Sequence, residues 1–148
     1  MTNHLSRIIS LILVFLMLII APLIYSYSVS EMEDRRLLLN DVTRFLDKVT
    51  DKGTITEDDI TEFALQVNSH GIVIKPTVKR LIRASVTTPE GNVRTINVAV
   101  DDIYSLNQRD TVQVTLEEVS MSAYRKLVKA ILRIDEGPYS LEMAAVVR

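Results

Sequence analysis

The side chains that most often carry chemistry are scarce in this chain of 148 residues, which has no cysteine and two histidines, His4 and His70. The absence of cysteine excludes disulfide bonds, thiol catalysis and cysteine-based metal sites. His70 precedes Gly71, where a helix is expected to end. We therefore expect His70 to interact with the carbonyl end of that helix, rather than to act as a base or a metal ligand.

Carboxylates are more frequent, but their spacing does not favour catalysis. Adjacent acids occur at Asp101–Asp102 and at Glu117–Glu118. Neighbours in a strand point to opposite faces, so neither pair is a ready-made dyad, and we expect loop or solvent-facing charges. Residues 48–59 resemble the second half of a calcium-binding EF-hand loop, yet two early ligand positions would hold lysine. This segment is expected to join two helices and to bind no calcium.

The glycine and serine residues form none of the common catalytic or nucleotide-binding motifs. The four glycines build no P-loop, no G-x-G-x-x-G loop and no G-x-S-x-G turn. We therefore predict no enzyme activity, no cofactor, no metal site and no small-molecule substrate. An isoelectric point near 5.7 and an aromatic content of 5% also argue against nucleic-acid binding.

The most informative feature is a segment of 23 uncharged residues from Ile8 to Ser30. As a helix it would reach about 35 Å, enough to cross a hydrocarbon layer of about 30 Å. It predicts a single-pass anchor in the lipid bilayer, with an amino terminus in the cytoplasm and the rest of the chain outside. The expected anchor positions include Ile8, Leu13, Phe15, Leu18, Ile20, Pro22, Tyr25 and Tyr27.

A cleaved secretory signal is the alternative interpretation of this segment. The apolar run from Ile8 to Ala21 is followed by Pro22, and Ser28 or Ser30 could end a cleavage site with small residues. The long apolar stretch, the serines in place of alanines and the single basic residue, Arg7, favour a retained anchor. Cleavage near Ser28 or Ser30 would instead give a secreted protein.

The residues after the anchor predict two helices. Leu38, Val42, Phe45 and Val49 follow a helical spacing, so the anchor is expected to continue into an amphipathic helix that ends at Lys52 and Gly53. Thr56 and Asp59 have the spacing of a capping box, and the helix that they begin is expected to extend to Gly71.

Extended structure is predicted beyond Gly71. Runs of β-branched residues between Ile72 and Val100, with turn residues at 88–92, predict a hairpin. Pro76 marks a strand edge, a bulge or a break. Further strands are expected at 111–119 and 139–147, with a helix at 121–133 between them. The predicted fold is α+β: an anchor at 1–30 and an extracytoplasmic domain at 31–148, divided into a helical stalk (31–71) and a sheet with a helix (72–148).

Charge is distributed unevenly along the predicted outer domain. Residues 31–62 hold ten acids and five bases, whereas residues 63–148 hold nine acids and eleven bases. The basic side chains are candidate contacts with the acidic helices of a neighbouring copy or with anionic lipid headgroups. These candidates are Lys79, Arg80 and Arg83 near the hairpin, and Arg125, Lys129 and Arg133 on the predicted last helix.

The stretch FLDKVTDKGTITEDDITEFALQVNSHG, residues 45–71, is similar to the helix-turn-helix that follows the membrane helix in TadE-like pilin-like proteins (pseudopilins) of Gram-positive Tad-type pilus or secretion systems. This resemblance implies one apolar helix, an extracellular helix pair and a β-rich remainder. The chain departs from the pilin pattern in one region, because no glycine precedes Gly53 and no acid lies between Met1 and Ser30.

These observations favour a non-enzymatic accessory or minor subunit of a Tad-like pilus or secretion apparatus. Its expected partners are the bilayer and other membrane or pilus-system subunits, including copies of itself. The alternative is a membrane-anchored extracytoplasmic module that binds or senses a ligand. The first hypothesis predicts assembly, whereas the second predicts a stable monomer with a pocket.

Overall fold

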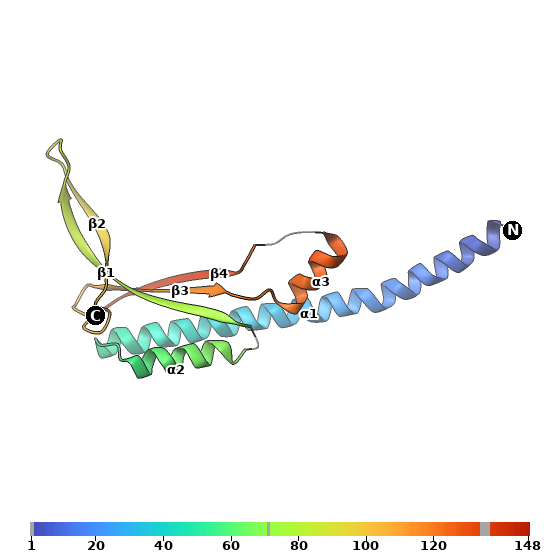
Figure 1. Cartoon of the computed structure of the whole chain (residues 1–148), viewed down its shortest axis with the longest axis horizontal. Helices are drawn as coiled ribbons and strands as arrows, with labels where there is room; N and C mark the ends of the chain where they lie inside the picture. Colours follow the sequence, from blue (N-terminus) through green and yellow to red (C-terminus); the bar gives the residue numbers. More distant parts are fainter. Residues whose placement is uncertain (1, 71, 134–136) are drawn as a thin grey trace. The chain divides into compact units, whose positions relative to one another are not determined.

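The computed structural model describes residues 2–70, 72–133 and 137–148. It contains three helices and four strands within these ranges (Figure 1). In chain order they are α1 (Thr2–Lys52), α2 (Glu57–Asn68), β1 (Ile74–Thr87), β2 (Val93–Val100), β3 (Thr111–Glu118), α3 (Ala123–Leu132) and β4 (Ser140–Val146). The predicted α+β class is confirmed, with a long apolar helix, a short helix, an antiparallel sheet and one further helix.

The chain divides into two compact units, one of residues 1–35 and 121–136 and the other of residues 36–120 and 137–148. In this division α3 groups with the apolar part of α1 and not with the sheet. Glu31 of α1 binds the start of α3, which accounts for this grouping.

The first unit combines the apolar part of α1 with α3. Pro22 lies inside α1. Along the apolar segment, Ile20, Ile24 and Ser28 are partly covered, while their neighbours are exposed. Their spacing places them on the helix face that also carries Glu31. This face is therefore the side of the apolar helix that packs within the protein.

Local sequence signals fix the helix ends in the second unit. Gly53 has a φ of 68° and donates its N–H to the carbonyl of Val49, which ends α1 as predicted. The capping box of α2 is confirmed, since Thr56 Oγ1 accepts from the Asp59 N–H and the Asp59 carboxylate accepts from the Thr56 N–H. The predicted end at Gly71 lies outside the described residues, and α2 itself ends at Asn68.

The four strands form one antiparallel sheet in the order β2-β1-β3-β4. β1 pairs with β3 from Ile74 to Leu81 and with β2 from Arg80 to Thr87. Pro76 lies where β1 pairs with β3 alone, so its missing N–H leaves no β2 partner unsatisfied, and the predicted edge position is correct. The two halves of β1 thus belong to two different pairings.

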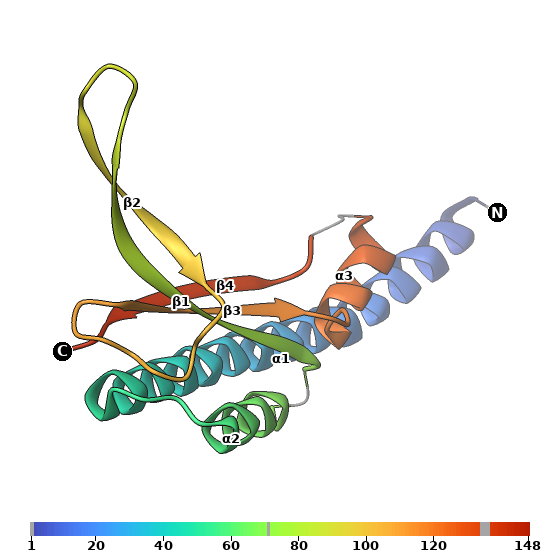
Figure 2. The same ribbon diagram turned by 60° about the vertical axis from the view of Figure 1, so that its left-hand side comes forward.

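The core of the second unit lies between the helices and one face of the sheet (Figure 2). Val112, Val114 and Leu116 of β3 are fully buried, as is Val42 of α1. The alternate β3 residues are more exposed, and Gln113 donates a hydrogen bond of 2.6 Å to the exposed Glu142 of β4. The sheet therefore has one core face and one hydrated face, as in many antiparallel sheets.

Two polar residues have partners that the sequence did not predict. His70 Nε2 lies 2.6 Å from Asp41 Oδ2 on α1, so His70 connects α2 to α1 rather than interacting with helix carbonyls. Glu118 is buried and accepts the Tyr139 N–H at 2.9 Å, whereas its neighbour Glu117 is exposed as expected. Both differences arise because chain segments distant in sequence meet in the fold.

Candidate interaction surfaces

The apolar segment of α1 is the most exposed hydrophobic surface among the described residues. Within His4–Lys52, the most apolar window of 18 residues has no buried residue. Leu13, Phe15 and Leu18 project from the protein, as do Ile8, Tyr25 and Tyr27, while Ile20 is partly covered. A helix that is long, apolar and exposed in this way is suited to a membrane anchor or a signal sequence.

A buried polar cluster lies directly after this apolar segment, in the first unit. Glu31 is only 6% exposed. Its carboxylate accepts hydrogen bonds from Arg35 Nη2 at 2.7 Å and from Ser122 Oγ at 3.0 Å, and lies 3.4 Å from Arg125 Nε. Ser122 is the N-cap of α3, so the carboxylate also faces the positive end of that helix. Glu31 therefore fixes the start of α3 beside the end of the apolar segment.

The structure separates the six basic contact candidates into two groups. Arg125 is buried beside Glu31, and Arg80 is only 7% exposed. These two guanidinium groups are used within the chain, because a buried charge requires a paired partner. The other four candidates, Lys79, Arg83, Lys129 and Arg133, are exposed. We keep only these four as candidates for contacts with other molecules.

Arg80 anchors the loop between β2 and β3. Its guanidinium lies 2.7 Å from Asp110 Oδ2 and donates a hydrogen bond of 3.2 Å to the Asp102 carbonyl. The backbone N–H of Tyr104 holds the pKa of the exposed Asp102 carboxyl below its usual range, helped by Ser105. Asp102 therefore organises its own loop, and the Asp101–Asp102 pair faces solvent as expected.

A shallow groove of about 210 Å³ lies between α1 and α2, lined by residues that include Phe45, Phe63, Lys48 and Asp59. Asp59 is buried and lies 3.0 Å from Lys48 Nζ and 2.8 Å from Lys52 Nζ. Lys52, and then Thr56, hold the pKa of Asp59 far below its usual range, while Glu62 and Asp59 raise the pKa of Lys48. The groove is thus crossed by ion pairs, which bind the two helices to each other.

We expect Asp59→Asn to lower the free energy of unfolding by about 1–2 kcal/mol at pH 7, because it removes the negative charge that pairs with both lysines. The effect stays modest because the two lysines are half-exposed and water screens them. The native carboxyl has a lowered pKa, so its contribution is complete above about pH 4 and is lost as the pH falls towards the native pKa. Chemical unfolding of both proteins between about pH 2 and pH 7 gives their difference in free energy of unfolding. We expect this difference to shrink as the pH falls and the carboxyl becomes protonated.

The matched control is Asp58→Asn, which removes a neighbouring acid from the same first turn of α2. Asp58 is exposed, so we expect a change within about 0.5 kcal/mol. Equal effects at both positions would mean that the first-turn charge, and not the buried network, stabilises α2.

The distal part of the β1–β2 hairpin, which we call the arm, is the second large exposed surface. It comprises Ile82–Thr87 of β1, the turn at 88–92 and Val93–Val98 of β2, and it continues past the last β1–β3 pair at Leu81 and Thr111 (Figure 2). The predicted turn closes it, since Gly91 has a φ of 83° and Thr88 N–H bonds to the Asn92 carbonyl. The sequence predicted this hairpin, but not that it extends as two strands alone.

Neither a metal site among the described residues nor a similarity to a known protein points to another function. Within residues 2–70, 72–133 and 137–148, no group of three or more His, Asp or Glu side chains could hold a metal ion. The architecture, an apolar N-terminal helix followed by a four-stranded antiparallel sheet, is pilin-like. Comparison with protein-family models, curated proteins and solved structures finds no match for this chain.

Proposed function

We propose that this protein is a non-enzymatic, single-pass membrane subunit of a Tad-like pilus or secretion apparatus. In this proposal the apolar part of α1 stays in the bilayer with its amino terminus in the cytoplasm, and the sheet-containing unit lies outside. The protein acts by contacting other subunits, including copies of itself. Its resemblance to TadE-like proteins at residues 45–71 supports the assignment to this type of apparatus.

One observation carries the proposal: the first half of α1 exposes an apolar surface, while the second half builds a folded core. The 18-residue apolar window has no buried residue, whereas Leu38, Val42 and Val49 of the same helix are fully buried. In water, an exposed apolar surface of this size is costly. Lipid removes that cost on the first half, and the sheet removes it on the second.

The exposed basic residues support contacts with other subunits. Lys79 and Arg83 lie on the sheet, and Lys129 and Arg133 lie on and at the end of α3. Acidic side chains such as Asp47, Asp51 and Asp58 are exposed on α1 and α2. Complementary charges on one chain favour contacts between copies and determine their orientation.

Chemical crosslinking in intact membranes tests this function. The exposed lysines Lys48, Lys75, Lys79 and Lys126 are available to an amine-reactive crosslinker. We expect species larger than the monomer, containing this chain and other pilus-system subunits by mass spectrometry, and we expect them to disappear when the membranes are dissolved and diluted before crosslinking. A protein that remains monomeric in its own membranes would contradict the proposal and favour the anchored ligand-binding module.

A further inference from the structure

The arm has one apolar face, which continues the core face of β1. Ile74 and Val78 of β1 pack in the core, and beyond the buried Arg80 on the same face Ile82, Ala84 and Val86 continue at alternate positions. In the register with β2, Ile82 lies opposite Val98 and Ala84 lies opposite Ile96. Directly opposed residues share a face of the sheet. We call these five residues the apolar stripe: Ile82, Ala84, Val86, Ile96 and Val98.

The stripe lies beyond the elements that cover the rest of the core face. Val86 is 45% exposed, and Ile96 and Val98 are 39% and 38% exposed. The opposite face of the arm carries polar side chains such as Arg83, Ser85 and Asn97, and Val93 is its one apolar residue. A strand pair with this alternation normally buries its apolar face, and a two-stranded ribbon alone is only marginally stable. The stripe therefore requires a covering partner.

The outer face of α2 carries an exposed apolar side chain and an exposed acid that complement the stripe and its neighbouring arginine. Leu65 is 70% exposed there, on the same helix face as Asp58 and Thr61 and away from the buried Phe63. Arg94 lies opposite Val86, at the end of the stripe, and is exposed. A helix seated on the arm through Leu65 would thus place a carboxylate of α2, Asp58, near the Arg94 guanidinium.

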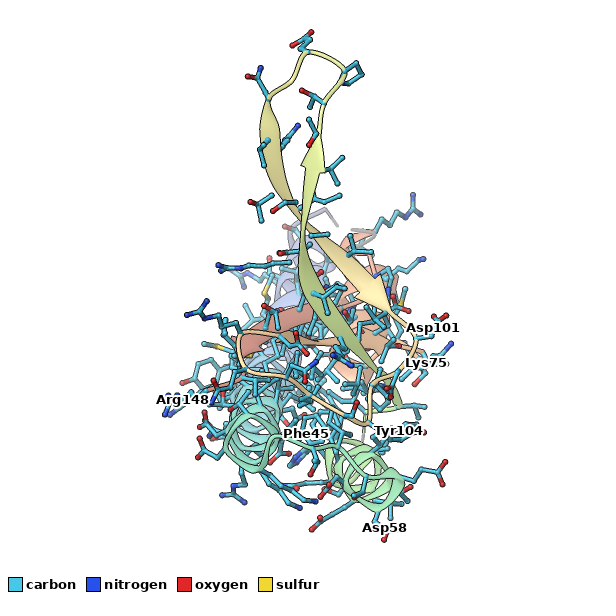
Figure 3. The ribbon with its side chains drawn as sticks, turned by 90° about the vertical axis from the view of Figure 1, so that its left-hand side faces the viewer. Phe45, Asp58, Lys75, Asp101, Tyr104 and Arg148 are labelled. Atoms are coloured by element: carbon cyan, nitrogen blue, oxygen red, sulfur yellow. The ribbon has the colours of Figure 1, made fainter. Side chains whose placement is uncertain are left out.

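The α2 face that meets the stripe must come from another molecule. Figure 3 shows Asp58 pointing away from α1 and the sheet, on the side opposite to the projecting arm. The arm of one chain therefore faces away from its own Asp58. We propose that the apolar stripe of the arm binds the outer face of α2 in a second copy of this chain.

This contact joins two different surfaces, so each copy keeps a free arm or a free α2 after it binds one neighbour. Contacts of this type extend into rings or filaments instead of stopping at a dimer. The inference rests on the proposed function, because it supplies the self-contact that a pilus-like assembly requires. It assigns the arm as the donor surface and α2 as the acceptor surface.

Site-specific disulfide formation tests the contact, because the chain has no cysteine of its own. Two differently tagged full-length chains, one with Ile96→Cys and one with Leu65→Cys, are produced together, and their membranes are treated with an oxidant. We expect a disulfide between the two tags, at least about fivefold more than for Asn97→Cys with Leu65→Cys, because bonding requires Cα atoms within about 7 Å. Asn97 is next to Ile96 but lies on the polar face.

Three further substitutions keep the test informative if Ile96→Cys disturbs the arm. Val98→Cys places the thiol on the same stripe and should bond to Leu65→Cys as well. Arg94→Glu should reduce this disulfide about threefold, and Asp58→Lys in the other chain should restore it, because the two charges are exchanged.

Three outcomes would overturn the inference. The Ile96→Cys and Val98→Cys chains could each bond only to themselves, which would mean that arms meet arms. The second outcome is that neither Ile96→Cys nor Val98→Cys forms more disulfide with Leu65→Cys than Asn97→Cys does. Alternatively, Asp58→Lys could fail to compensate for Arg94→Glu. Amine-reactive crosslinking of the same membranes separates this failure from failure of the proposed function: larger species without the cysteine bond overturn only the arm contact, whereas monomers overturn both.

Discussion

The double substitution Leu16→Arg with Ile19→Arg should release the full-length protein from the membrane or prevent its insertion. Both side chains are exposed in the apolar part of α1. An arginine at the centre of a membrane helix costs about 2.5–3.5 kcal/mol on insertion scales, so the pair costs roughly 5–7 kcal/mol. Fractionation of cells, with alkaline extraction of the membranes, measures the loss.

The matched control is Leu16→Ala with Ile19→Ala, which shortens the same side chains without adding charge. We expect this variant to remain in the membrane fraction, because the rest of Ile8–Ser30 is unchanged. The intact mass of the membrane-bound native protein also distinguishes a retained anchor from a cleaved signal. A mass that corresponds to cleavage near Ser28 or Ser30 would contradict the anchor.

Phe45→Ala should lower the free energy of unfolding of the sheet-containing unit by about 3–5 kcal/mol. Phe45 of α1 stacks on Phe63 of α2 with ring centroids 4.3 Å apart and planes at 20°. Both rings are buried, as Figure 3 shows for Phe45 between the two helices. The truncation loses this contact and leaves a cavity that the flanking helices can fill only in part.

Thermal unfolding of the full-length protein in detergent, followed by circular dichroism, measures this effect. We expect the midpoint to fall by more than about 10 °C for Phe45→Ala. Leu65→Ala is the control, because Leu65 lies on α2 but is exposed, and its change should stay within about 0.5 kcal/mol. Similar losses for the two variants would show that the α1–α2 interface does not stabilise the unit.

The features that the sequence predicted correctly are those that depend on nearby residues. The end of α1 follows from Gly53, whose left-handed backbone closes the last turn. The start of α2 follows from Thr56 and Asp59, which bond to each other's backbone. Alternation and turn residues placed the strands to within one or two residues. Each signal acts over a few positions, so no tertiary information was needed.

The sequence could not predict the partners of its buried charges. Arg80 and Arg125 belong to patterns of exposed basic residues, yet each meets an acid that is far away in the chain, Asp110 or Glu31. Asp41 likewise pairs with His70 across two helices. Spacing alone cannot distinguish such a residue from a solvated one, because only the packing of separate elements removes its water.

By itself, the sequence determined an apolar segment long enough to span a bilayer, the α+β order of elements and the lack of cysteine and motif-based chemistry. These follow from composition and local periodicity. The tertiary structure alone decided that α3 packs beside the end of the apolar segment through Glu31, and that β1 leaves β3 at Leu81 to form the arm. Both depend on strand register and on contacts between distant residues, which the chain acquires only when its core assembles.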